Sequence, residues 1–488
     1  MMRDPRTLED YSEADVTVGH QKEYAAGVKA VAVSMKRALG HMGPKRSAQT
    51  LVKLNQADGF DCMSCAWPDP ELGHRHTAEF CENGAKAVAE EATTAGAPPE
   101  FFAANSIAAL DGHSEWWLGQ QGRITQPLVK RPGATHYTPI EWDEAFALIA
   151  DELKALGSPD EATFYTSGRA SNESAFAYQL FVRAFGTNNL PDCSNMCHES
   201  TSVGLAESIG IGKASVSIED VHHAQLIIVA GQNPGTNHPR MLSALEIAKR
   251  NGATIVSINP LREAGLVAFK NPQNAKGLVG DGTKLTDLHL PIKINGDLAL
   301  FQALGSLLVK WDALDHDFID RYTKGFTEWK AHVSGIDWEM VTEVTGLTRA
   351  QITELAQLLR ASAATVFCWA MGLTSTATAW PPSVRCTTWP SPRATSASRV
   401  RACSRCAGTR TCRAIGRWAS GSDHRTTSWT RCSWNSGSTR RASTDWTPSI
   451  RSEHCGTARP TSSSASAATS CRPRRTSRSS WRGCGELG

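Results

Sequence analysis

The chain has 488 residues, with 51 basic and 48 acidic side chains, and this length predicts about three domains at roughly 150 residues each. No apolar run approaches the ~20 residues of a membrane-spanning helix, so we expect no membrane span. The amino terminus, MMRDPRTLEDYSEADV, has neither the basic nor the apolar region of an export signal. We therefore expect a cytoplasmic protein.

Residues 1–60 are predicted to form an N-terminal lead, with a basic helix-like stretch from Val28 to Leu39. A cysteine-bearing segment follows within residues 61–140 and contains Cys62, Cys65 and Cys81. Thiolates two residues apart can ligate one metal centre, either zinc or an iron–sulfur cluster. Incidental buried thiols are the alternative interpretation.

Three cysteines do not complete a four-thiolate site, so the fourth ligand stays open. His74 and His76 lie between Cys65 and Cys81 in the sequence and are candidates, although histidines are common on protein surfaces.

Residues 141–374 alternate apolar strand-like runs with amphipathic helical patterns. This alternation predicts an α/β fold with a mostly parallel sheet and ligand-binding loops at the strand ends. The expected strands are residues 162–166, 225–230, 254–258 and 364–369. The expected helices are residues 142–156, 173–185, 240–250, 297–311 and 349–361.

Three loops rich in Gly, Asn and Pro follow apolar strands in this core. Each alone is compatible with an ordinary turn, but three at successive strand ends favour a nucleotide-like cofactor, because backbone amides there can approach phosphate groups. The candidate cofactor-binding residues in these loops are Gly168, Arg169, Asn172, Gly231, Asn233, Pro234, His238, Asn259 and Arg262.

A second cysteine motif, DCSNMCHES, contains Cys193 and the adjacent pair Cys197-His198. A cysteine beside a histidine can be a nucleophile with its base, or a soft metal ligand with a proton acceptor next to it. The dipeptide alone is weak evidence, and a purely structural role is the alternative.

The composition changes abruptly between Thr374 and Ser375. Residues 375–488 contain no Lys, Gln, Phe, Tyr or Met, but they contain 19 Arg, seven Trp and eight Cys against four acids. A disordered basic tail that binds nucleic acid would be poor in Trp and Cys. These residues are instead what a GC-rich gene gives when it is translated out of frame, and we discount the C-x-x-C pair at Cys403 and Cys406 for this reason.

The shifted reading frame supports this interpretation. With GC-favoured codons, residues 376–389 read RHGVATIREVHNL from the third base, and restoring one base after Thr374 gives TQH at the junction. The recovered text has helical spacing and Gly/Pro turns, which an arbitrary frame should not produce. We therefore expect residues 375–488 to be a frameshifted translation without a fixed structure.

Together, the motifs resemble the molybdopterin oxidoreductase family, in its formate-dehydrogenase-like alpha-subunit branch. The blocks that carry the resemblance are TSGRASNESAFAYQLFVRAFGTNNLPDCSNMCHESTSV, GQNPGTNHPRML, HLPIKINGDLALFQALGSLL and CWAMGLT. The resemblance implies a multidomain fold of which residues 141–374 form an incomplete molybdopterin-binding core.

The resemblance also implies cofactors and their ligands. Cys197 falls where the family binds molybdenum, His198 falls on its proton-handling histidine, and the three loops match contacts to a bis(molybdopterin guanine dinucleotide). Cys62, Cys65 and, more weakly, Cys81 resemble ligands of an iron–sulfur cluster of the [4Fe–4S] type. The chain departs from the family in its incomplete run of four cysteines and in Asn83, which replaces the expected Lys.

The predicted function is a molybdenum oxidoreductase that passes electrons between a small substrate, formate first, and an external carrier or partner subunit. A reductase of an oxyanion such as nitrate is the second hypothesis. A non-enzymatic remnant, inactive as written, is a further hypothesis of a different class. A basic tail that binds nucleic acid is the third alternative, but our expectation is that the chain has no nucleic-acid partner.

Overall fold

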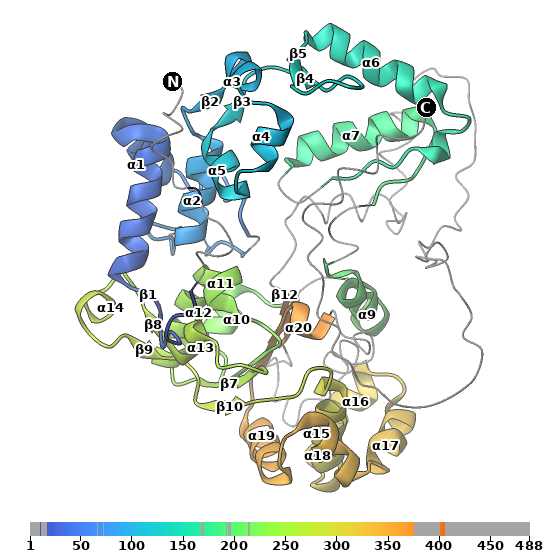
Figure 1. Ribbon diagram of the computed structural model, residues 1–488. Coiled ribbons are helices and arrows are strands. Elements are labelled where there is room, and N and C mark those ends of the chain that lie inside the picture. Colours follow the sequence, from blue (N-terminus) through green and yellow to red (C-terminus); the bar gives the residue numbers. More distant parts are fainter. Residues whose placement is uncertain are drawn as a thin grey trace, which may run out of the picture.

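The computed structural model describes residues 10, 17–65, 67–71, 73–166, 170–191, 193, 197–212 and 215–374, and the backbone of residues 401–405. Its centre is a five-stranded parallel sheet with the strand order β10-β7-β6-β11-β12 (Figure 1). These strands are β6 (Leu226–Ala230), β7 (Thr254–Ile258), β10 (Leu288–Leu290), β11 (Thr365–Trp369) and β12 (Arg401–Arg405).

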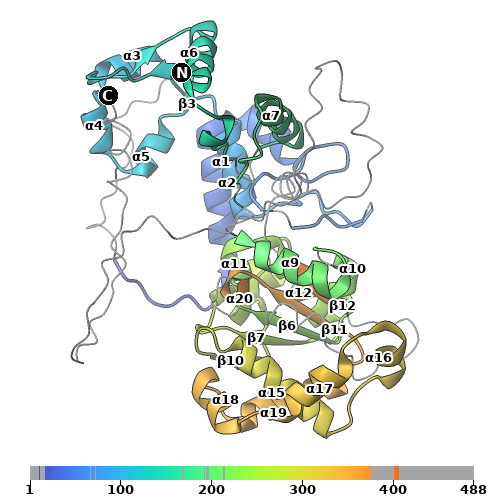
Figure 2. The same ribbon diagram turned by 90° about the vertical axis from the view of Figure 1, so that its right-hand side faces the viewer.

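The sheet is buried on both faces, as parallel sheets require. Side chains alternate along β6: Leu226, Ile228 and Ala230 join one apolar cluster, whereas Ile227 and Val229 join another. Figures 1 and 2 both show α15, α18 and α19 on one side of the sheet and α12 on the other. This two-sided core holds the carboxyl ends of the strands at one edge.

Helices before and after the strands supply these covers. The helices that flank the sheet, and those that pack beside them, are α9 (Glu199–Ile209), α10 (Ile218–His222), α11 (Pro234–Asn237), α12 (Pro239–Arg250), α13 (Ala264–Val267), α14 (Ala275–Val279), α15 (Asp297–Lys310), α16 (His316–Tyr322), α17 (Phe326–Ser334), α18 (Trp338–Thr345), α19 (Arg349–Ala361) and α20 (Met371–Thr374). A smaller sheet of order β1-β8-β9 consists of β1 (Ala25–Ala26), β8 (Ala268–Lys270) and β9 (Thr283–Lys284).

The N-terminal part is built from shorter elements. Helices α1 and α2 pack together through Ala38, Met42, Ala85 and Val88, and α1 is interrupted at Gly43, which has a positive φ and precedes Pro44. The elements of this part are α1 (Val28–Leu51), α2 (Glu82–Glu91), β2 (Gly96–Ala97), α3 (Pro99–Ala104), α4 (Ile107–Asp111), α5 (Glu115–Gln120), β3 (Arg123–Ile124), β4 (Leu128–Val129), β5 (Thr138–Pro139), α6 (Trp142–Ala155), η3 (Pro159–Glu161) and α7 (Asn172–Phe185).

The predicted α/β fold with parallel sheets is confirmed, but residues 162–166 do not form the predicted strand. Instead, the backbone amide of Phe164 donates to the carbonyl of Asn189 at 2.9 Å. The Phe164 side chain packs with Val182 and Leu190 in a small cluster of its own. Residues 162–166 therefore pack against α7 and do not join the central sheet.

Strand β12 lies within the segment for which we expected no fixed structure. It pairs in parallel with β11, and the pairing needs only backbone groups, because the edge of β11 offers N–H and C=O groups to any extended segment. The rest of residues 375–488 lies outside the described residues. Within the described part of the chain, no helix is long and apolar enough to cross a membrane.

Candidate functional site

The loops after β6 and β11 meet at the carboxyl edge of the central sheet. The amide of Gly372 donates to the carbonyl of Gly231 at 3.0 Å. Gly231 has a φ of +57°, and a Cβ at this position would lie 2.8 Å from the backbone of Gly372. Only glycine permits this close crossing of two chains without strain.

A buried asparagine joins the loop after β7 to the loop after β6. The side-chain oxygen of Asn259 accepts a hydrogen bond from the amide of Gln232 at 2.9 Å, and its side-chain nitrogen donates to Ser257 at 3.1 Å. In the same loop, Asn233 caps α11 by accepting from the amide of Thr236, and it donates to Glu263. Two of the three predicted cofactor loops are thus held together at one edge.

The cysteine–histidine pair reaches this edge from α9. The sulfur of Cys197 lies 3.4 Å from the sulfur of Met371, one residue before Gly372. Behind it, Ser200 donates to the carbonyl of Thr374 at 3.0 Å, and the Trp369 indole donates to Thr201 at 3.2 Å. The start of α9 is therefore bound to the end of β11.

His198 is fully buried beside Cys197, with 1% of its surface exposed. It stands at the N-cap of α9, where its carbonyl accepts from the amide of Ser202 at 2.9 Å. Cys193 is half-buried, and among the described residues it is Cys197 whose sulfur contacts Met371.

Two buried polar atoms at the sheet edge have no hydrogen-bond partner among the described residues. They are the side-chain oxygen of Gln232 and Nδ1 of His238. Burial lowers the pKa of His238 to about 4, so its imidazole is neutral near pH 7. Buried polar groups without a hydrogen-bond partner are rare in native proteins. The Gln232 oxygen and the His238 nitrogen are therefore suited to hydrogen-bond a polar ligand at this edge.

The remaining predicted cofactor residues are less well placed. Gly168 and Arg169 lie outside the described residues, and Asn172 is an exposed residue at the start of α7. Arg262 lines a small hollow with Ser257, Glu263, Lys284 and His289.

The three cysteines of the N-terminal segment come together around α2. Cys81 caps this helix by accepting from the amide of Gly84, and a Cβ at Gly84 would lie 3.0 Å from the sulfur of Cys62 and 3.8 Å from that of Cys81. Cys65 packs instead against the cluster on the α12 side of the central sheet. The segment thus spans from the α1–α2 pair to the core.

Burial raises the pKa of all three thiols, that of Cys81 to about 11, and the charges of Cys65 and Cys62 add smaller increases for Cys81. A single zinc ion that bound all three at ~2.3 Å would need their sulfurs within roughly 4.6 Å of one another. Among the described residues, these three sulfurs are not all within 4.8 Å. As placed, the three sulfurs therefore do not form a ready site for a single zinc ion.

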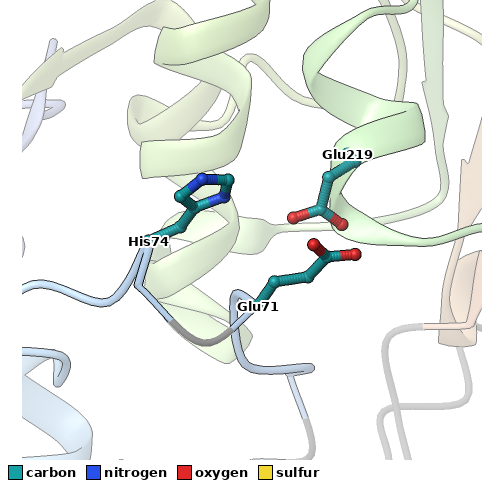
Figure 3. Close-up of side chains that lie close together, drawn as sticks. All are labelled: Glu71, His74 and Glu219. Carbon is teal, nitrogen blue, oxygen red and sulfur yellow. The ribbon is translucent and has the colours of Figure 1, made fainter.

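The histidines between these cysteines contact other groups. The His74 imidazole lies with the carboxylates of Glu71 and Glu219 (Figure 3). The contacts described for His76 run through its backbone, to Glu79 and Gln56. Neither observation supports a histidine as the fourth ligand of the cysteine centre.

Two polar links join the cysteine segment to the loop after β6. Asn83, two residues after Cys81, donates to the carbonyl of Thr236 at 2.7 Å. The buried guanidinium of Arg240 binds Asp69 at 2.9 Å and Glu79 at 2.7 Å. The sequence offered Asn83 as a departure from the family, but neither these partners nor the roles of Gln232 and Met371 could be predicted from it.

The molybdopterin oxidoreductase family model matches residues 123–342, a stretch that contains β6, β7, β10 and α9. Residues 123–342 are therefore similar to the molybdopterin oxidoreductase family. This match agrees with the resemblance seen in the motifs.

Several known proteins are similar to this chain. An uncharacterized oxidoreductase of Mycobacterium tuberculosis is 55% identical over 373 residues, which cover 75% of this chain and 48% of that protein. Protein YdeP of Escherichia coli is 42% identical over 71% of this chain and 46% of its own length. Formate dehydrogenase H of Escherichia coli is 29% identical over 52% of this chain and 34% of its own length.

The chain spans about half the length of the first two relatives. The family that the matched family model describes implies a molybdenum–pterin cofactor.

Proposed function

We propose that the edge formed by the ends of β6, β7 and β11 holds a molybdenum bis(molybdopterin guanine dinucleotide), with Cys197 as the metal ligand. One observation carries the proposal: Cys197 and the Gly231 loop, which lie 34 positions apart in the sequence, meet through Met371 and Gly372. A soft thiolate at a crossing of glycine-rich loops is the ligand type that a redox-active soft metal prefers.

The loops would hold the organic part of the cofactor. Backbone amides after Gly231 and Asn259 can approach pterin and phosphate groups, and Arg262 supplies a positive charge beside them. The orphaned atoms of Gln232 and His238 are further donors or acceptors for its ring atoms. Gly168, Arg169, Asn172, Asn233 and Pro234 complete the proposed set.

When bound, the cofactor supplies a centre that exchanges two electrons with the substrate, and a cluster passes them on singly. The chain's own residues would position the substrate and take up its proton. We assign His198 as the group that accepts the substrate proton, because it is buried next to Cys197 and water is excluded from it.

The cysteine segment is proposed to bind an iron–sulfur cluster through Cys62, Cys65 and Cys81. Asn83 and Arg240 would fix the distance between this cluster and the cofactor loop, since both bridge the two parts. An external carrier or partner subunit would then take the electrons, in the cytoplasm.

Formate oxidation is the proposed reaction, because formate dehydrogenase H is among the relatives of the family core. Reduction of an oxyanion such as nitrate is the alternative. We infer that the chain as written is inactive, because residues 375–488 have the composition of an out-of-frame translation and would not complete the enclosure of the cofactor.

The test compares Cys197→Ala with Cys193→Ala in a polypeptide whose reading frame is restored after Thr374. We expect Cys197→Ala to lower formate oxidation by at least about 100-fold and to change the molybdenum EPR signal, because alanine cannot replace a thiolate ligand. Cys193→Ala should keep both activity and signal. Loss in Cys193→Ala alone would overturn the assignment, and nitrate reduction without formate oxidation would select the alternative reaction.

A further inference from the structure

A mixed oxygen and nitrogen ligand set lies at the junction between the cysteine segment and α10. The carboxylates of Glu71 and Glu219 and the imidazole of His74 each offer one ligand atom, and these atoms all lie within 4.8 Å of one another. Figure 3 shows the two carboxylates facing each other, with the imidazole turned toward the space beside them. The three side chains come from two segments that are about 145 positions apart in the sequence.

None of these three side chains makes a hydrogen bond or ion pair that the structure records among its described residues. Two carboxylates this close repel each other unless a cation or a proton lies between them. A cation held between the two carboxylates would relieve this repulsion.

Networks on both sides fix the ligand positions. In the loop, the guanidinium of Arg75 donates to the carbonyls of Pro70 and Asn55, and the amide of His74 donates to the carbonyl of Glu71. Asp69 is further held by Arg240 in a buried ion pair. Because the backbone of the loop is held at these points, the entropy lost on ion binding is mainly that of the Glu71 and His74 side chains.

Helix α10 is equally well defined. Ser217 and Asp220 form a capping box at its start, so the position of Glu219 is set by two reciprocal hydrogen bonds. His222 follows Glu219 by three residues and so lies on the same face. Burial lowers the pKa of His222, the Glu219 carboxylate raises it, and His74 is the smallest of the charges that lower it. A second imidazole therefore lies near Glu219 and His74.

We propose that Glu71, His74 and Glu219 bind a divalent first-row metal ion of the Mn²⁺ type, with water completing its coordination. Carboxylates suit Mg²⁺, Ca²⁺ and Mn²⁺, whereas imidazole suits the first-row transition ions, so the mixed set selects an ion that accepts both. The ion would fasten the cysteine segment to α10 and the central sheet. This site is separate from the cysteines and from Cys197, and it does not depend on the proposed function.

The test uses Mn²⁺ as the probe on the purified full chain, because thiols compete strongly for zinc but weakly for manganese. Loss of the free Mn²⁺ EPR signal counts the bound ions, and we expect about one per chain. Glu219→Gln and His74→Asn should each weaken binding at least about tenfold, since each removes one ligand. Mn²⁺ should also raise the unfolding temperature of the wild type but not of these variants.

Glu339→Gln, on α18 far from this junction in the sequence, is the matched control and should bind Mn²⁺ as the wild type does. Glu71→Gln is a second ligand variant at an exposed position, where the substitution does not threaten the fold. The proposal is overturned if the wild type retains no Mn²⁺. It is equally overturned if His74→Asn binds as tightly as the wild type, since the site is then only an acidic surface.

Discussion

Asn83 is the residue at which the cysteine segment touches the cofactor loop. It donates to the Thr236 carbonyl at 2.7 Å, and the resemblance to the family leads us to expect Lys at its position. An amide makes this contact without a charge, so the link is a position-fixing hydrogen bond. A lysine would add a positive charge between the two proposed redox centres.

We expect Asn83→Ala, in the frame-restored polypeptide, to slow reduction of the cluster by formate more than it affects formate binding, because the link is lost but the active site is untouched. The measurement is kcat against KM, with rapid-freeze EPR of the cluster. Asn83→Lys should restore the rate if charge can replace the hydrogen bond. Unchanged kcat in Asn83→Ala would contradict a role in coupling the two parts.

Two buried ionisable residues give the fold opposing responses to pH. Burial raises the pKa of Asp297 to about 6, so this carboxyl favours the folded state when it is protonated. Its contribution is present below its ordinary pKa and is lost as the pH rises through about 6. Burial lowers the pKa of His238 to about 4, so its contribution is present above pH 6.5 and is lost as the pH falls toward 4.

We therefore expect Asp297→Asn to raise the free energy of unfolding at pH 7 by about 2 kcal/mol, and to leave it nearly unchanged at pH 4. The variant should then lose stability more steeply on acidification, because the His238 response is no longer opposed. Urea unfolding at several pH values measures this. Asp281→Asn, at an exposed position, is the control, and equal effects of the two substitutions at pH 7 would exclude burial as the cause.

At the scale of elements, α6 presents an apolar stripe to solvent. Trp142, Phe146 and Ile149 lie at positions i, i+4 and i+7 and are 62%, 59% and 55% exposed. The rings of Trp142 and Phe146 lie 5.5 Å apart. Residues at this spacing share one helix face, and an exposed apolar face of this kind promotes association.

We expect the double substitution Phe146→Gln and Ile149→Gln to reduce association of the chain, because glutamine keeps helix propensity and removes the apolar face. Light scattering against protein concentration, together with binding of a hydrophobic dye, measures the change. Glu152→Gln on the same helix is the control. Dye binding that persists at the wild-type level would show that another surface is responsible.

The whole molecule is divided by the change in composition after Thr374. The alignment with the Mycobacterium tuberculosis relative covers 75% of this chain. The change in composition after Thr374 is the observation on which the proposed single-base loss rests. Beyond this point, β12 pairs with β11 through backbone groups, so the pairing does not depend on which side chains β12 carries.

We predict that adding one base after the Thr374 codon lets the coding DNA read TQHRHG. We also predict that the chain as written retains little or no molybdenum, whereas the frame-restored polypeptide retains about one atom per chain. Sequencing across the codon and elemental analysis of the purified proteins measure the two. DNA that cannot be read as TQHRHG would refute the frame shift, and stoichiometric molybdenum in the chain as written would refute its inactivity.

The sequence by itself determined the α/β class and much of the central sheet. Strands such as 254–258 are largely apolar runs, which predict burial on both faces of a sheet. Helices such as 297–311 have apolar residues at helical spacing, which predicts burial of one face. The sequence also located the Cys197-His198 motif and the loops after β6 and β7, because glycine and asparagine at strand ends have local physical reasons to be there.

Only the tertiary structure decided which of these groups meet. That Phe164 packs on α7 rather than in a sheet, that Cys197 lies at Met371, and that Asn83 reaches Thr236 all depend on contacts between segments that are distant in the chain. Periodicity is a property of neighbours along the sequence, whereas a site is a property of neighbours in space. Glu71, His74 and Glu219 share no local pattern, and only the packing of the loop against α10 brings them together.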